Sequence, residues 1–173
     1  MRVRVIDKQP NSRMCFVCGR DNRFGLHSRF FRVDDDRLVA LFTPADEHQS
    51  YPGRLHGGIS AAILDETIGR AIMIRHGGDI WGVTLEFSMK FRKPVPLDCQ
   101  LKVVASITAE GRRSFEGEGS ILCPDGSVAV SGRGKYLKMP LEKITDLDLD
   151  ADEWSVQSEP DDPESLLCPD LGG

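Results

Sequence analysis

The sequence predicts an α+β fold in which one long helix packs on one face of an antiparallel sheet. The helix is indicated by an apolar stretch at residues 55–75 that carries few charges. The sheet is indicated by segments whose apolar residues recur with a period of two, and by the turn sequence "PDGS" between two such segments. A sheet with one covered face and one helix layer satisfies both patterns.

The expected strands flank the helix in chain order. The segment "TLEFSMKFR" at 84–92 alternates most clearly, with Leu85, Phe87, Met89 and Phe91 on one face and polar residues on the other. Two prolines end this strand shortly afterwards. The remaining strands are expected at 37–43, 99–110, 113–122 and 128–139.

The 173 residues suit one domain with a substantial core, preceded and followed by looser segments. We expect a flexible N-terminus at 1–13, a single domain at 14–140 and a disordered acidic tail at 141–173. The tail holds eleven acidic residues and one lysine, so residues 1–140 carry about +5 although the whole chain carries −5.

The composition limits the kinds of partner and the cellular compartment that we expect for this protein. The basic residues are scattered, without an aromatic-interleaved run, so a nucleic-acid partner is not expected. The sequence has no apolar run long enough for a membrane span and no apolar segment typical of a signal peptide near its start. Five cysteines, an odd number scattered along the chain, favour a reducing cytoplasm.

Asp65 lies in the middle of the predicted helix, on a face made mostly of small residues. That face contains Gly58, Ala61, Ala62, Ile68, Gly69 and Ile72. Small residues allow a second chain or a ligand to approach the backbone. An ionised aspartate is costly to bury there without partners, so Asp65 either accepts hydrogen bonds from neighbouring backbone or belongs to a site. Glu66 lies about 100° away and is expected to form an ordinary ion pair with Arg70 on a wetter side.

The predicted helix begins with His56, Gly57 and Gly58, which leave its first turn nearly bare. The unpaired N–H groups there, at the positive end of the helix dipole, can hold an oxygen that acquires negative charge. His56 could donate to the same oxygen or orient a ligand. Alternatively, the glycines only make a tight joint into the helix and His56 caps it.

Gly57 and Asp65 are separated by eight residues, or roughly 12 Å along a helix axis. One chain's Asp65 would then not reach a carbonyl held at its own Gly57. If both act on one carbonyl, the aspartate comes from a second copy of the helix, packed antiparallel across a two-fold axis.

At these residues the sequence resembles the hotdog-fold acyl-CoA thioesterases, specifically the PaaI-like (phenylacetate-degradation) branch. The resemblance runs through "YPGRLHGGISAAILDE", "GVTLEFSMKFRKPVPLDCQLKVVASITAEGRR" and "DGSVAVSGRGKYLKM", over roughly residues 37–139. Its core is a His-Gly-Gly with an acidic residue nine positions after the histidine. The segment "CFVCGRDNRFGL" also resembles an N-terminal extension found in a subset of these proteins.

The resemblance implies a helix wrapped by an antiparallel sheet, a homodimer or homotetramer, and hydrolysis of acyl-CoA. It implies that Asp65 is a general base or nucleophile, that the Gly57 N–H polarises the thioester carbonyl with His56 and Gly58 beside it, and that Thr84 positions the water or the carboxylate. Some relatives have an amide side chain six positions before the histidine; here that position is Ser50, with Gln49 next to it.

Coenzyme A is part of the implied substrate, and the chemistry requires no metal and no bound cofactor. The phosphates of coenzyme A suit basic side chains, and the candidates for contacting them are Arg92, Lys93, Arg112 and Arg113. Each such residue is more often an ordinary solvated surface charge.

Two other functions remain open. Hotdog hydratases and dehydratases also act on acyl thioesters, but their catalytic residues follow a different motif. The His-Gly-Gly-x₆-Asp arrangement of this sequence therefore argues against a hydratase or dehydratase. A non-catalytic acyl-CoA-binding module would keep the fold, and the presence of Asp65 and Thr84 argues against it.

Cys15 and Cys18 form a CxxC motif. Structural packing explains the pair most simply. A zinc site needs further ligands, for which His27 and Cys99 are the candidates, and a redox role would need a strand followed by a helix start that the sequence lacks here.

Overall fold

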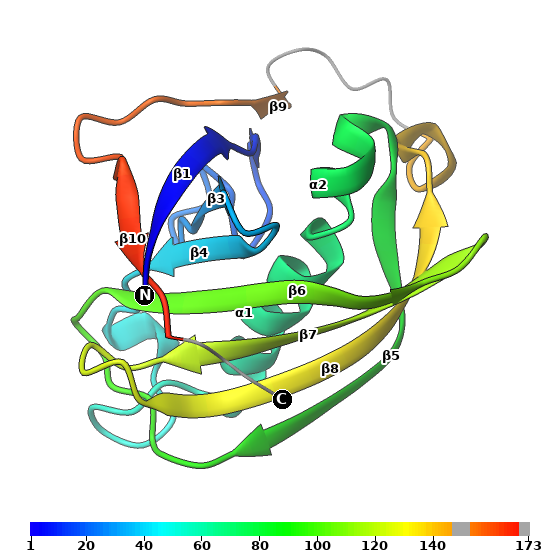
Figure 1. The fold of residues 1–173 in the computed structure, drawn as a ribbon. Coiled ribbons are helices and arrows are strands. Elements are labelled where there is room, and N and C mark those ends of the chain that lie inside the picture. The colour runs from blue at the N-terminus through cyan, green and yellow to red at the C-terminus, as the bar shows by residue number, and fades with distance from the viewer. Residues whose placement is uncertain (147–152, 170–173) are drawn as a thin grey trace.

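The computed structural model describes residues 1–146 and 153–169, and within them an antiparallel sheet curves around one long helix, as Figure 1 shows. The helix α1 spans Gly57–Arg70. The sheet has eight strands in the order β10-β1-β3-β4-β6-β7-β8-β5. The predicted α+β architecture is confirmed. The strands of this sheet are β1 (Arg2–Lys8), β3 (Arg29–Val33), β4 (Leu38–Phe42), β5 (Trp81–Phe91), β6 (Leu101–Glu110), β7 (Ser114–Leu122), β8 (Val128–Met139) and β10 (Ser165–Leu167).

The smaller elements lie around this layer pair. β2 (Asn11–Ser12) pairs with β9 (Trp154–Ser155) in a separate two-stranded sheet. The predicted helix at 55–75 is divided, because α1 ends at Arg70 and a short α2 (Met73–His76) follows. Short 3₁₀ helices occur at η1 (Asp46–His48), η2 (Gly77–Asp79) and η3 (Leu141–Lys143).

The expectation of a flexible N-terminus and a disordered tail is corrected where the structure describes these segments. β1 pairs with β3 on one side and with β10 from the tail on the other, so both ends of the chain extend the sheet. Val3 and Leu166 are buried in a shared apolar cluster. Arg29 binds the acidic side chains of residues 159–162. Acidic residues that suggested disorder thus have basic partners far away in sequence. Residues 147–152 and 170–173, also within the predicted tail, lie outside the described residues.

A bulge in β5 corrects the predicted alternation of that strand. Its pairing with β8 shifts register between Thr84 and Glu86, which leaves Leu85 as the extra residue. Thr84 therefore faces α1, where a regular strand would have turned it away from the face that Phe87 and Met89 share. Leu85 instead is 53% exposed on the edge strand of the sheet.

The helix packs on the sheet through large residues that meet glycines. Ile63, Leu64, Ile68 and Ile72 are fully buried on α1 and just after it. A Cβ added to Gly117 of β7 would lie 2.7 Å from Cγ2 of Ile68, closer than real Cβ contacts. The absence of a side chain at this strand position therefore sets how closely α1 approaches the sheet.

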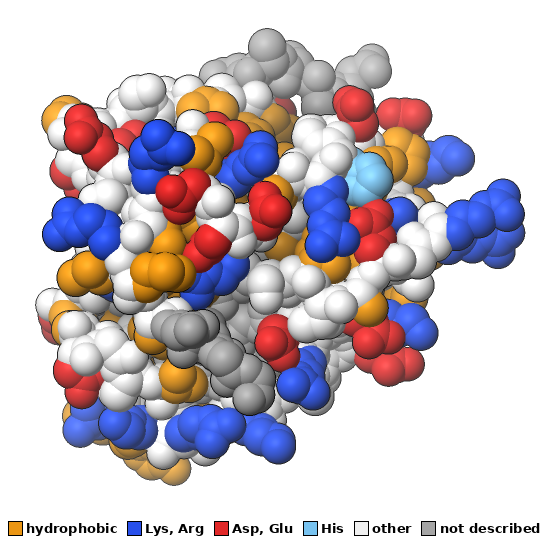
Figure 2. Space-filling model, viewed as in Figure 1, with side chains coloured by type: hydrophobic (Ala, Val, Ile, Leu, Met, Phe, Trp, Pro, Cys, Tyr) orange, Lys and Arg blue, Asp and Glu red, His pale blue; other side chains and the backbone are white. Residues whose placement is uncertain are grey.

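The surface carries charges of both signs. On the face shown in Figure 2, acidic and basic side chains are interspersed, and basic side chains also project at the tip of the β6–β7 hairpin. None of the helices in the described residues is long and apolar enough to cross a membrane.

The close packing of Ile68 on β7 predicts that Gly117→Ala destabilises the protein by about 1–3 kcal/mol, the usual cost of overpacking a core. Gly78→Ala is the matched control, because nothing lies within 4 Å of a Cβ added there. Chemical denaturation of both variants measures the free energy of unfolding. Equal stabilities would contradict this account of the helix–sheet contact.

Candidate active site

The N-terminus of α1 has a donor that is free to bind a ligand. The Gly58 N–H donates to Nδ1 of the His56 ring at 2.9 Å, and the N–H groups of Ile59 and Ser60 donate to the His56 carbonyl. Among the described residues, the Gly57 N–H has no such acceptor. His56 therefore caps the helix, as the simpler interpretation expected, and the cap leaves the Gly57 N–H available.

The loop before the helix brings the two polar candidates beside it. Gln49 forms an antiparallel bridge with Leu55, and the His56 N–H donates to the His48 carbonyl at 2.9 Å. Gln49 and Ser50 are both exposed near the helix start. On the other side, a Cβ placed on Gly57 would lie 3.4 Å from the Phe91 ring at the end of β5.

Asp65 is held by side chains from two strands. The Thr84 hydroxyl of β5 lies 2.9 and 3.0 Å from the two carboxylate oxygens of Asp65. The Tyr136 hydroxyl of β8 donates to Oδ1 of Asp65 at 3.1 Å. Among the described residues, side chains of the sheet donate to the Asp65 carboxylate, and not the neighbouring backbone that the alternative interpretation expected.

Tyr136 is a site residue that the sequence analysis missed. It is fully buried, and its ring stacks on Phe115 with centroids 5.0 Å apart. Glycines make room for the ring: a Cβ on Gly69 would lie 3.3 Å from it, and one on Gly134 would lie 2.5 Å from its hydroxyl oxygen. The sequence signal for Tyr136 was the glycine two residues before it in "GKYLKM". This pattern identifies a site residue only when β8 is known to pack against α1.

The electrostatic environment of Asp65 suits a proton acceptor. Burial raises the pKa of its carboxyl group, while the hydrogen bonds from Thr84 and Tyr136 act in the opposite direction. Burial and the nearby Asp65 carboxylate raise the pKa of Tyr136, so this hydroxyl stays protonated and remains a donor. A carboxylate with a raised proton affinity and fixed donors is an arrangement expected of a general base.

The small-residue face around Asp65 divides into an open half and a buried half. Gly58 is exposed and Ala61 is partly exposed, whereas Ile68, Gly69 and Ile72 are buried against the sheet. The open half lies toward the helix N-terminus. The Asp65–Thr84 pair is itself at the surface, because Thr84 is exposed. In one chain the carboxylate thus stands at a surface.

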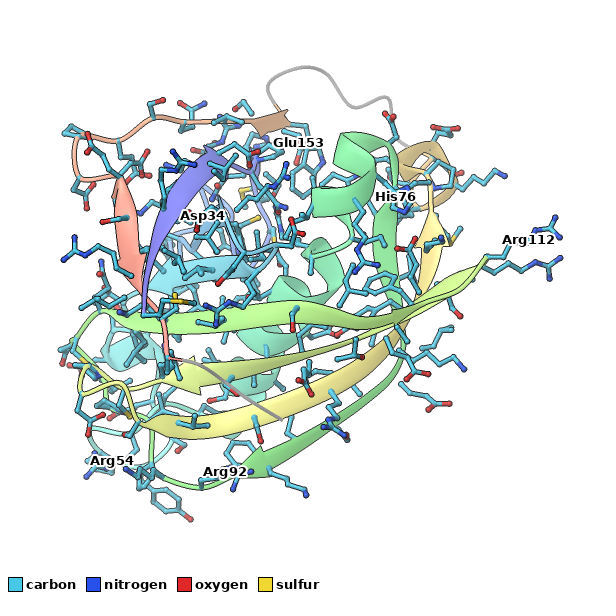
Figure 3. The ribbon with its side chains drawn as sticks, in the orientation of Figure 1. Asp34, Arg54, His76, Arg92, Arg112 and Glu153 are labelled. Carbon is cyan, nitrogen blue, oxygen red and sulfur yellow. The ribbon has the colours of Figure 1, made fainter. Side chains whose placement is uncertain are left out.

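The four basic candidates form two groups far apart. Arg92 and Lys93 follow β5, and their N–H groups donate to the Ala129 carbonyl. Arg112 and Arg113 lie at the tip of the β6–β7 hairpin, beside the opposite end of β5, as the labels of Arg92 and Arg112 in Figure 3 show. The length of β5 between them corresponds to roughly 33 Å.

A groove of about 1000 Å³ lies elsewhere, with Ser88, Glu118, Ser120, Ser131 and Arg133 among its lining residues. Neither Asp65 nor Gly57 lines this groove, so the groove is not part of the candidate site on α1. Its polar residues alternate along the strands with glycines that face α1.

The predicted ion pair of Glu66 and Arg70 exists, but the expectation that it lies on a wetter side is wrong. Nε of Arg70 is 2.9 Å from Oε1 of Glu66, and the Arg70 side chain is only 3% exposed. The N-terminal segment covers the pair: Arg70 donates to the Pro10 carbonyl, and the Cys15 thiol donates to Glu66.

Comparisons with known proteins show which family and which relatives this chain resembles. The family model described as the thioesterase superfamily matches residues 52–130, which include Gly57, Asp65 and Thr84. The acyl-coenzyme A thioesterase THEM4 of Bos taurus is 28% identical over 142 residues, which are 80% of this chain and 57% of that protein. THEM4 of Xenopus laevis is 30% identical over 87 residues, which are 50% of this chain and 38% of that protein. The chain thus spans about half the length of the curated relatives it matches.

Solved structures show the same fold. A crystal structure of a thioesterase superfamily protein superposes with a TM-score of 0.66 at 27% identity, covering 72% of this chain and 60% of that one. A mutant thioesterase from Pseudomonas aeruginosa superposes with a TM-score of 0.60 at 22% identity, and the match covers 67% of this chain and 84% of that one. Residues 52–130 therefore match the thioesterase superfamily model, and the chain has the hotdog fold.

Proposed function

We propose that this protein hydrolyses an acyl-CoA thioester to the free acid and coenzyme A. The observation that carries the proposal is the Asp65 carboxylate, held by Thr84 and Tyr136, on a helix whose first N–H has no acceptor among the described residues. Thioester hydrolysis needs a proton acceptor for water and a donor for the carbonyl oxygen, and the helix offers both. The THEM4 relatives, named acyl-coenzyme A thioesterases, support the substrate class.

In the proposed reaction, Asp65 accepts a proton from a water molecule whose oxygen attacks the thioester carbonyl carbon. The Gly57 N–H donates to the carbonyl oxygen as it gains negative charge. The tetrahedral intermediate then collapses, the carbon–sulfur bond breaks, and the coenzyme A thiolate takes up the proton. In the variant mechanism, the Asp65 carboxylate attacks the carbonyl carbon, the carbon–sulfur bond breaks and the coenzyme A thiolate leaves. Water then hydrolyses the resulting anhydride, which restores Asp65, and the thiolate takes up the proton that the water releases. His56 orients the donor because its ring fixes the first turn through Gly58.

We further propose that the site is completed by a second copy of the chain. Asp65 lies eight residues beyond Gly57, roughly 12 Å along the helix, so the two groups of one chain are too far apart for one carbonyl. The edge strand β5 exposes Leu85 and Phe91, which are 53% and 59% exposed. A two-fold pairing at this edge would cover them and would bring the Asp65 of one chain toward the Gly57 of the other. A homodimer is the proposed unit, and a tetramer would pair two such dimers.

The finer assignments follow the same geometry. Arg92 and Lys93 lie at the end of β5, next to Phe91 and hence to Gly57, and are the better placed of the four basic residues for coenzyme A phosphates. Gln49 and Ser50 flank the same helix start. We also propose that the protein belongs to the PaaI-like branch, is located in the cytoplasm and needs no cofactor for the reaction.

Asp65→Asn is expected to lower thiol release from acyl-CoA substrates by about 10²–10⁴-fold, because the amide cannot accept the proton. The measurement uses a panel of short, medium, long and aromatic acyl-CoAs. Asp79→Asn, at an exposed aspartate outside the site, is the matched control and should keep full activity.

Three results of that panel, extended by a β-hydroxyacyl-CoA, would count against hydrolysis by Asp65. Undiminished turnover by Asp65→Asn would remove it from the reaction. Dehydration of a β-hydroxyacyl thioester without thiol release would indicate a dehydratase. Ligand binding without any turnover would indicate a binding module.

Gly57→Pro should remove the proposed carbonyl donor without breaking the helix. Proline is favoured at the first helical position, and His56 has φ −64° and ψ 136°, a conformation compatible with a following proline. We expect kcat to fall about 10²–10³-fold, as for loss of one oxyanion donor. Gly57→Ala keeps the N–H and should retain most of the activity. Similar rates for the two variants would exclude this role of the Gly57 N–H.

Tyr136→Phe is expected to move the acid limb of the pH–rate profile to higher pH. The Tyr136 hydrogen bond lowers the pKa of Asp65, so its loss raises that pKa, and more alkaline solution is needed for the active carboxylate. The profile of kcat/KM against pH measures the shift. A shift toward lower pH would refute the assignment of Asp65 as the base.

A further inference from the structure

The CxxC motif packs against α1 on the side of Glu66, and the three side chains form a compact cluster. The two Sγ atoms of Cys15 and Cys18 and a carboxylate oxygen of Glu66 all lie within 4.8 Å of one another. His27 and Cys99, the further ligands that the sequence suggested, are not part of this cluster. Glu66 is instead the third candidate ligand. It lies beside the cysteines because the N-terminal segment packs on α1, which the sequence alone does not show.

We propose that Cys15, Cys18 and Glu66 bind one Zn²⁺ ion, with water in the fourth position. This site lies on another side of α1 from Asp65 and is independent of the proposed thioesterase reaction. Its role is to tie the N-terminal segment to the central helix.

The three ligand atoms are near enough to one another for a tetrahedral zinc site. With zinc–sulfur bonds of about 2.3 Å and zinc–oxygen bonds of about 2.0 Å, two sulfurs would be about 3.8 Å apart, and sulfur and oxygen about 3.5 Å. The Cys15 sulfur and Oε2 of Glu66 are 3.1 Å apart in their hydrogen bond. Replacing the shared proton by zinc therefore needs these two atoms to move apart by about 0.4 Å, and the other two pairs of ligand atoms lie within 4.8 Å.

Each ligand already has a donor that would fix it around a metal. The Val17 N–H donates to the Cys15 sulfur at 3.3 Å, and Nη2 of Arg70 donates to the Cys18 sulfur at 3.1 Å. Nε of Arg70 donates to Oε1 of Glu66, which leaves Oε2 on the side of the cysteines. Outer donors of this kind are a general feature of metal sites.

The backbone turn that carries the cysteines is constrained at Gly19. The Gly19 N–H donates to the Cys15 carbonyl at 2.8 Å, and a Cβ there would lie 2.3 Å from that carbonyl oxygen. The Cys15 N–H in turn donates to the Ser12 hydroxyl at 2.9 Å. A side chain at residue 19 would open the turn that holds the two thiols together.

Charge balance permits a cation here although Arg70 is adjacent. Zinc displaces the protons of both thiols, so two thiolates offset the two charges of the ion and the net charge of the site does not change. The Arg70 guanidinium remains balanced by Glu66, as it is in the structure.

The same cluster is poorly built for thiol–disulfide exchange. A reactive cysteine must be accessible to the molecule with which it exchanges. Cys18 is fully buried, and the partly exposed Cys15 donates its thiol proton to Glu66. The buried Cys18 thiol is thus out of reach of a partner protein, which favours a metal site over a redox pair.

The test is a Zn²⁺ titration of the reduced full chain against a chromophoric chelator, after dialysis with a stronger chelator. We expect about one zinc per chain and a higher melting temperature with zinc, because an ion that binds only the folded state stabilises it. Cys15→Ser and Cys18→Ser should abolish this binding, and Glu66→Gln should weaken it by about tenfold or more. The Cys99→Ser/Cys123→Ser double variant and Glu86→Gln are the matched controls and should bind as the unchanged chain does.

Cobalt substitution keeps the test valid if a cysteine variant fails to fold. Co²⁺ bound by two thiolates in the unchanged chain should give intense sulfur-to-metal charge-transfer absorption that zinc abolishes. The proposal is overturned if the reduced chain takes up no zinc, if uptake depends on Cys99 and Cys123 instead, or if Cys15 and Cys18 are joined by a disulfide in protein purified under reducing conditions.

Discussion

The close approach of α1 to the sheet is the constraint on which the rest of the structure depends. Gly117 lets Ile68 pack against β7, and Gly69 and Gly134 leave room for the Tyr136 ring between helix and sheet. Because the helix is this near, the Tyr136 and Thr84 hydroxyls reach the Asp65 carboxylate at hydrogen-bond distance. A more distant helix would leave a half-buried carboxylate without donors, which is costly. The same packing that forms the core therefore also prepares the proposed base.

Two neighbouring acidic residues of α1 have different environments because they point in different directions. Asp65 faces β5 and β8 and stands at the surface near an uncovered sheet edge, where a second chain would complete the site. Glu66 faces the N-terminal segment, where Arg70 and Cys15 cover it. One helix thus serves a proposed catalytic centre on one side and a proposed zinc site on another. The N-terminal segment and the acidic tail join the sheet around this helix.

Much of the domain was predictable because its signals are local. The signals lie within short stretches of sequence: the apolar stretch of the helix, the strand segments at 84–92, 99–110, 113–122 and 128–139, and the glycines after His56. Each corresponds to an element in the structure. The family resemblance added Thr84. The missed features all depend on contacts between distant residues. Tyr136 meets Asp65 from 71 positions away. The Leu85 bulge changes which face Thr84 occupies, and β1 and β10 pair across most of the chain. Composition alone indicated disorder for the tail, since it does not show that Arg29 binds the acidic residues.

The most direct test of the account is to mix Gly57→Pro and Asp65→Asn chains, refold them together and measure thioester hydrolysis. In a two-fold dimer whose sites combine Gly57 of one chain with Asp65 of the other, each mixed dimer has one intact site. Random pairing should then restore about a quarter of the unchanged activity, because half of the dimers are mixed and one of their two sites works. A site contained within one chain would have a defect in every copy. Activity that stays at the level of the separate variants, with mixed dimers demonstrated, would contradict the composite site.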